Sequence, residues 1–232
     1  MITIIINTVV CVCALAGFIT GAVKFFRKKK VLYSQMVTVA LGCAALGRLY
    51  NISVMVCGSG IPRTFNTGVL AAIGCFMFIF SANYGEMDSL CDMNFKRNKR
   101  LKLTALAVPA IFAAAAAAVF MMSEAPLAMR LTYAAEILFI ALAAYFNFKH
   151  LRAEDIERGI IRSLRWYNFL SLMLAILYTA EIVLDAFEFV RVKNIVYVLM
   201  SACLLMIIPA LEKGVTKWRA KPAKNRRKAQ NG

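Results

Sequence analysis

Histidine and acidic residues are scarce in this 232-residue sequence. Its single histidine, His150, stands in no HExxH or other paired-histidine pattern, which disfavours a histidine-based zinc enzyme and a Ser–His–Asp hydrolase. The sequence also lacks a Walker A loop and a dinucleotide-binding glycine pattern. The seven cysteines fall mainly within apolar runs, so we expect free thiols and no disulfide framework. We therefore predict neither a metal site nor a cofactor.

The shortage of acids leaves a strongly basic chain. Twelve Asp and Glu residues stand against 28 Lys and Arg residues, which gives a formal net charge of +16. In a soluble protein this balance would suggest nucleic-acid binding. Here 61% of the residues are hydrophobic, and the basic residues cluster between long apolar runs. This pattern favours a membrane protein and argues against a nucleic-acid partner.

Seven apolar runs organise the chain. Each is close to the roughly 20 residues that an α-helix needs to cross a bilayer. We predict an all-α integral membrane protein, a bundle of seven transmembrane helices that forms one domain over residues 1–212. A basic tail at 213–232 is expected to be disordered and cytoplasmic. The predicted spans are about 2–23, 31–56, 68–90, 103–122, 131–148, 166–187 and 194–211.

The basic residues predict the orientation of the bundle. Of the 28 Lys and Arg residues, 23 lie at 24–30, 96–102, 149–165 and 213–228, all on one side of the predicted membrane. The positive-inside rule assigns this side to the cytoplasm, with the N-terminus outside and the C-terminus inside. We expect a multi-pass protein of the plasma (inner) membrane whose cytoplasmic face contacts anionic headgroups.

Polar residues within the spans form an expected outer-half cluster. Tyr178, Glu181 and Asp185 follow i, i+3, i+7 spacing and share one helix face. Arg48 is the only basic residue deep in a span, and Glu136 and Glu181 are its natural counterions. The cluster could bind a small zwitterion or polar headgroup, with Arg48 taking the anionic end. The alternatives are a self-satisfied ion-pair network that fixes helix register and a proton or ion relay. Its members are Arg48, Asn51, Glu136, Tyr178, Glu181, Asp185 and Tyr197.

A second polar group lies at the inner end of the third span. Its three acids depart from a boundary otherwise rich in Lys and Arg. They could pair with loop arginines, or they could form a gate or a docking site for a partner. The members of this group are Ser81, Asn83, Tyr84, Glu86, Asp88 and Asp92.

These clusters favour a non-enzymatic function. We expect recognition of a small polar or lipid-like ligand in an outer-half cavity, by a receptor or sensor or by a small carrier, with a cytoplasmic or membrane protein as a further partner. One alternative is an intramembrane lipid-modifying enzyme with Glu181 and Asp185 as acid and base. Another is a structural or assembly subunit. A retinal Schiff base is disfavoured, because the last span contains no lysine and Lys193 lies only at its outer edge.

Overall fold

The computed structural model describes residues 2–26, 32–58, 65–87, 99–152, 160–230 of the chain. In these residues every regular element is helical, and seven helices are long and apolar enough to cross a membrane. Two short π-helical segments, η1 (Ala22–Phe26) and η2 (Asn83–Met87), continue the first and third of them. The seven helices are α1 (Ile2–Gly21), α2 (Leu32–Val56), α3 (Thr67–Ala82), α5 (Lys99–Met122), α6 (Leu127–Arg152), α8 (Arg165–Ala186) and α9 (Val190–Gln230), and α7 (Ile160–Ser163) is a single turn.

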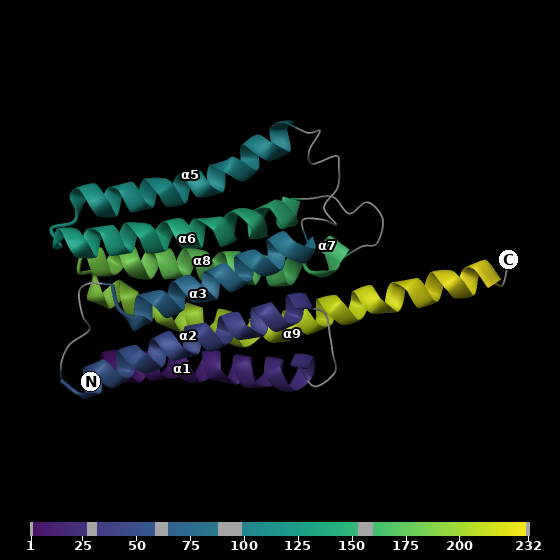
Figure 1. The fold of residues 1–232 in the computed structure, drawn as a ribbon, viewed down its shortest axis with the longest axis horizontal. Coiled ribbons are helices and arrows are strands. Elements are labelled where there is room, and N and C mark those ends of the chain that lie inside the picture. Colours follow the sequence, from purple (N-terminus) through teal and green to yellow (C-terminus); the bar gives the residue numbers. More distant parts are fainter. Residues whose placement is uncertain (1, 27–31, 59–64, 88–98, 153–159, 231–232) are drawn as a thin grey trace.

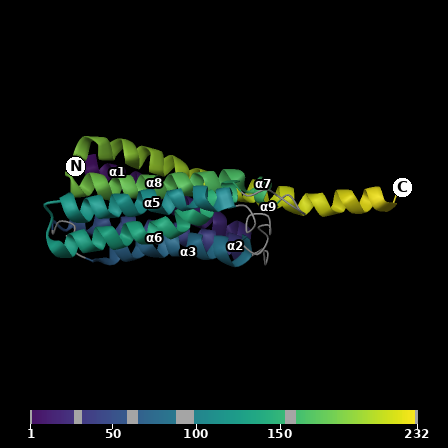
Figure 2. The ribbon, with the colours of Figure 1, turned by 90° about the horizontal axis from the view of Figure 1, so that it is seen from above.

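The long helices form an elongated bundle (Figures 1 and 2). Six of the helices form a ring in which each helix packs against the next. Their order around the ring is α1, α2, α3, α6, α8 and α9, and α9 packs back against α1. The seventh long helix, α5, lies outside this ring and packs mainly on α6. The end of the bundle at which α1, α3, α6 and α9 begin is called the N-terminal end below. The candidate site lies between the ring helices at this end.

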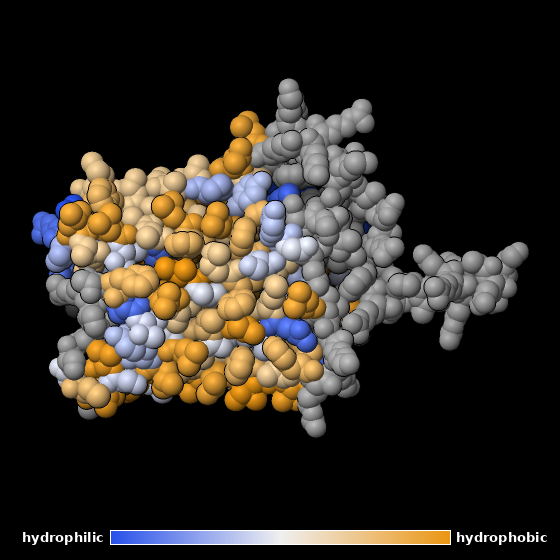
Figure 3. All heavy atoms as spheres, viewed as in Figure 1, coloured by the Kyte–Doolittle hydropathy of each residue, from blue (hydrophilic) through white to orange (hydrophobic). Residues whose placement is uncertain are grey.

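The surface and the core are both apolar, as expected for helices surrounded by lipid. Large hydrophobic side chains are exposed on every long helix, and hydrophobic residues predominate among the described residues on the face shown in Figure 3. The core between the ring helices includes fully buried Phe76, Ile137, Leu174 and Leu204. In a bilayer, whose lipid tails are as apolar as these side chains, burial alone would not hold such helices together, and close packing and polar contacts would contribute.

Small residues let α2 and α3 approach each other next to the site. A Cβ atom added to Gly47 would lie 3.2 Å from the backbone oxygen of Gly68 and 3.1 Å from the Cβ of Ala71. A side chain at Gly47 would therefore be in tight contact with α3 and would require its neighbours to shift. Asn66 caps the start of α3, since its side-chain oxygen accepts hydrogen bonds from the backbone N–H groups of Gly68 at 2.8 Å and Val69 at 3.1 Å.

The turn between α8 and α9 reverses the chain within three residues. Glu188 adopts a left-handed backbone conformation with φ of 60°, a position at which a helix end usually has glycine. The backbone N–H of Phe189 donates to the oxygen of Leu184 at 2.9 Å and closes the turn. As a result, the start of α9 lies against the end of α8.

All seven predicted apolar runs form helices, but several ends differ from the prediction: α5 begins at Lys99 instead of about 103, and α6 covers Leu127–Arg152 instead of about 131–148. The third helix passes into η2 at Asn83, and the predicted end of this span at residue 90 lies outside the described residues. The last helix continues to Gln230, whereas the sequence predicted a helix end near 211 and a disordered tail. The extra stretch is rich in Ala, Lys and Arg, which have high helix propensities. The six cysteines that the structure describes are free.

Candidate functional site

A cavity of about 110 Å³ lies between the ring helices at the N-terminal end. Its walls come from α2, α3, α6, α8 and α9, together with Asn66 just before α3. The structure brings all seven members of the expected outer-half cluster to this one cavity. They come from four different helices, α2, α6, α8 and α9. The seven predicted residues among those that line the cavity are Arg48, Asn51, Glu136, Tyr178, Glu181, Asp185 and Tyr197.

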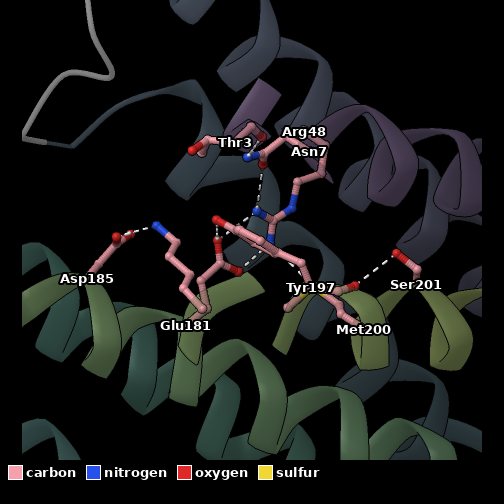
Figure 4. A network of polar contacts seen from close by, with 9 residues as sticks. Thr3, Asn7, Arg48, Glu181, Asp185, Tyr197, Met200 and Ser201 are labelled. Carbon is pink, nitrogen blue, oxygen red and sulfur yellow. Dashed lines mark hydrogen bonds and ion pairs between the residues drawn. The ribbon is translucent and has the colours of Figure 1, made fainter. Parts of the chain in front are cut away.

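An ion pair between Arg48 and Glu181 forms the centre of the site (Figure 4). Both terminal nitrogens of Arg48 donate to the carboxylate of Glu181, one of them at 2.7 Å, so the pair is bidentate. Arg48 is 4% exposed, and the side chain of Glu181 is 12% exposed. The phenol of Tyr197 donates a third hydrogen bond to Glu181 at 2.9 Å. These hydrogen bonds join the largely buried side chains of α2, α8 and α9.

The remaining contacts of Arg48 leave its guanidinium enclosed. One terminal nitrogen also donates to the side-chain oxygen of Asn7 in α1 at 3.3 Å, and the other lies 3.3 Å from the sulfur of Met200. The guanidinium carbon is 5.1 Å from the ring centroids of both Tyr178 and Tyr197, within the range of cation–π attraction. Both terminal nitrogens are therefore used within the protein.

A second ion pair joins Lys193 of α9 to Asp185 of α8. The ammonium of Lys193 also lies 5.6 Å from the ring centroid of Tyr197. The side chain of Asp185 is 40% exposed, so this pair reaches the surface at the edge of the cavity. The short turn at Glu188 is what brings the two residues together, since it folds α9 back against α8.

Glu136 differs from the other charged residues of the cavity. It was one of two expected counterions of Arg48, but Arg48 pairs with Glu181 instead. Glu136 is 6% exposed and lines the cavity from α6, and within the described part of the chain no side chain forms an ion pair or hydrogen bond with it. A buried carboxylate without a partner is costly, so this residue is the one that a bound group would stabilise.

The cavity is closed towards the middle of the bundle. The ring of Phe76 packs edge-on against Tyr178 with 5.1 Å between centroids, and Phe76 and Leu174 are fully buried. These side chains separate the cavity from the other half of the bundle. A molecule of a few heavy atoms could enter from the N-terminal end and meet one carboxylate, two ion pairs and three tyrosine rings, those of Tyr133, Tyr178 and Tyr197.

Sequence reasoning missed Asn7 and the pairing role of Lys193. Asn7 is a buried amide in an apolar helix, and that isolated polarity was the available signal. Lys193 was noted only as a residue at the end of a span. The cavity walls also include Asn66, Met129, Thr132 and Tyr133, which sequence reasoning did not identify.

The members of the second predicted group that the structure describes do not share one environment. Asn83 is fully buried, whereas Tyr84 is exposed and stacks on Phe80 at the bundle surface. Ser81 is partly buried, and Glu86 lies in η2. Asp88 and Asp92 lie outside the described residues.

A buried polar chain crosses the other half of the bundle. Tyr33 of α2 donates to the side-chain oxygen of Asn83 at 3.2 Å, and the amide nitrogen of Asn83 donates to Asn147 of α6 at 2.9 Å. On α8, Asn168 and Ser171 are fully buried, and their side chains have no hydrogen-bond partner within the described residues. Polar groups therefore occur on both sides of the Phe76 barrier.

Within the described residues, no group of three or more His, Cys, Asp and Glu side chains is arranged to hold a metal ion. In comparisons with models of known protein families, with curated proteins and with solved structures, no match to this chain was found.

Proposed function

We propose that this protein is a multi-pass plasma (inner) membrane protein that recognises a small polar molecule from the outer side, as a receptor or sensor or as a small carrier. The proposal places the N-terminal end of the bundle outside the cell. It is supported by the concentration of Lys and Arg residues at the opposite end of the spans. In this orientation the cavity faces outward and the basic surface meets anionic headgroups and any cytoplasmic partner.

The observation that carries the proposal is Glu136, a buried carboxylate that faces a cavity without a partner. A purely structural ion-pair network would satisfy all of its charges, because each unpaired buried charge destabilises the fold. The Arg48–Glu181 pair meets that condition, but Glu136 does not. Binding sites retain such groups because a ligand satisfies them.

A lipid-modifying enzyme is a weaker explanation of the same residues. Its expected acid and base were Glu181 and Asp185. Glu181 is held by two hydrogen bonds from Arg48 and one from Tyr197, so its oxygens are occupied. Asp185 pairs with Lys193 at the cavity edge. Neither carboxylate is available to transfer a proton unless an ion pair breaks first.

The buried polar groups beyond the barrier favour a carrier as the second form of the proposal. A carrier must expose its site alternately to both sides, and polar groups along that path would replace water around the ligand. Tyr33, Asn83 and Asn147 occupy this position, and Asn168 and Ser171 offer further polar groups on α8. Uptake into proteoliposomes of a molecule that the cavity binds would separate a carrier from a receptor.

The proposal is tested by filling the cavity. Ala72 lines the cavity and is 7% exposed, so Ala72→Leu should occupy much of its volume. Thermal unfolding of the purified protein is measured with a panel of small cationic, anionic and neutral molecules. At least one is expected to raise the midpoint of the parent and not that of Ala72→Leu.

The matched control for this test is Ala116→Leu. Ala116 is 5% exposed and lies on α5, away from the cavity. It makes the same change in volume and should keep the response of the parent. If no member of the panel stabilises the parent more than Ala72→Leu, recognition by this cavity is wrong.

A further inference from the structure

We infer that the cavity selects a small organic cation, a protonated amine or a methylated ammonium of roughly six heavy atoms or fewer. This inference rests on the proposed function and adds the charge and the size of the ligand. The sequence predicts a small zwitterion or polar headgroup, with Arg48 taking its anionic end. In the structure the terminal nitrogens of Arg48 donate to Glu181 and Asn7, which favours a cation instead.

One carboxyl group that lines the cavity has no counterion within the described residues. Five charged side chains contribute to the walls, and four of them form two ion pairs. Arg48 neutralises Glu181, and Lys193 neutralises Asp185. Glu136 is the fifth, and within the described residues it has no ion-pair partner. A cation would therefore stabilise the ionised form of Glu136, whereas an anion would be repelled by it.

Arg48 is not available to attract an anion. Its terminal nitrogens already donate to Glu181 and Asn7. The rings of Tyr178 and Tyr197 are within cation–π distance of its guanidinium. An anion could reach these donors only by displacing the buried carboxylate of Glu181, which would then be left without its counterion. Removing one partner of a buried pair is strongly destabilising, so this exchange is unfavourable.

Helix α6 presents a surface suited to an ammonium group. Met129, Thr132, Tyr133 and Glu136 all line the cavity, and their spacing places them on one face of the helix. Glu136 supplies the counterion, the hydroxyl oxygen of Thr132 can accept a hydrogen bond, and Tyr133 adds an aromatic side chain to the same wall. On α2, Asn51 adds a further oxygen to the walls.

The protein already holds one ammonium group in this manner. Lys193 of α9 places its ammonium against the carboxylate of Asp185 and 5.6 Å from the ring of Tyr197. A carboxylate with a tyrosine ring is thus an occupied ammonium site at the edge of the cavity, and Glu136 with Tyr133 repeats the two residue types inside it. The size limit follows from the volume, because about 110 Å³ is less than the roughly 150 Å³ cavity that accommodates benzene.

The test measures the thermal stability of the purified protein with methylammonium, ethanolammonium and tetramethylammonium chlorides. Sodium acetate and acetamide serve as an anion and a neutral molecule of similar size, at constant ionic strength. The cations should raise the midpoint of unfolding in a saturable manner, and acetate and acetamide should not. Glu136→Gln, which keeps the size of the side chain, should weaken the apparent affinity for the cations by at least about tenfold.

Two further variants make the result specific. Glu136→Asp keeps the charge and should retain the preference for cations with weaker affinity. Glu124→Gln removes an exposed carboxylate near the start of α6 that does not line the cavity, and it should behave as the parent.

Equal binding of cations by the parent and Glu136→Gln would overturn the inference. Stabilisation by acetate or acetamide but not by cations would also overturn it, while leaving recognition by the cavity intact. The absence of any response in the parent that exceeds that of Ala72→Leu would contradict both proposals.

Discussion

The ion pair between Arg48 and Glu181 should dominate the stability of the N-terminal half of the bundle. Both side chains are buried, at 4% and 12% exposure, and the pair is bidentate. Removing one partner of such a pair leaves an uncompensated charge, which typically costs about 3–5 kcal/mol. Glu181→Gln should therefore lower the free energy of unfolding by about 3–5 kcal/mol.

The pair between Lys193 and Asp185 provides an internal comparison on the same two helices, α8 and α9. The side chain of Asp185 is 40% exposed, so water screens this pair. Asp185→Asn should cost at most about 1 kcal/mol. Glu181→Gln and Asp185→Asn thus each replace a carboxylate by an amide, and the two positions are one turn apart on α8. Glu181 lies towards the core and Asp185 lies at the edge of the cavity.

The assay is equilibrium unfolding of the purified protein in mixed micelles by titration with sodium dodecyl sulfate. A double variant, Arg48→Met with Glu181→Gln, removes both charges. The introduced amide oxygen can still accept the hydrogen bond from the hydroxyl of Tyr197. It should be more stable than Glu181→Gln alone, because no buried charge remains unpaired. If Glu181→Gln costs no more than Asp185→Asn, or if the double variant is the least stable, the central role of this pair is wrong.

Three further predictions follow from the fold. Asn7→Ala removes the hydrogen-bond acceptor for Arg48 in α1 and should lower the unfolding free energy by about 1 kcal/mol. Thr8→Ala, on the exposed face, should change the unfolding free energy less, and equal losses in the two variants would contradict the role of Asn7. Gly47→Ala should destabilise the protein by about 1–3 kcal/mol, because its Cβ would press on the backbone of Gly68. Gly74→Ala, whose Cβ would lie 3.5 Å from Cys43, should be tolerated. If Gly47→Ala had no effect on stability, the close approach of α2 and α3 would be refuted. In a variant that keeps Cys57 as its single cysteine, this exposed residue should react with a membrane-impermeant maleimide on intact cells, and reaction only after permeabilisation would reverse the proposed orientation.

The helices were predictable because span length and apolar composition are local properties of the sequence. Their ends were less so. The third helix changes to π-helical geometry at Asn83, and the last helix continues beyond Lys213 through residues of high helix propensity that span length does not limit. Neither feature follows from hydrophobicity, which was the basis of the predicted boundaries.

The members of the candidate site were predictable, but their pairing was not. Depth along each span placed Arg48, Glu136 and Glu181 at one level, and they do line one cavity. Which acid pairs with Arg48 depends on helix adjacency, which a single sequence does not contain. The ring order places Glu181 of α8 opposite Arg48 and leaves Glu136 on α6 unpaired. Lys193 joins the site only because the chain turns back at Glu188.

The most direct test of ligand recognition is native mass spectrometry of the protein released from nanodiscs prepared with its own membrane lipids. The parent, Ala72→Leu and Ala116→Leu are compared after purification under identical conditions. A small bound molecule that is present on the parent and on Ala116→Leu, but absent from Ala72→Leu, is the result that the proposed function predicts. A molecule retained equally by all three proteins, or bound by none of them, would contradict recognition in this cavity.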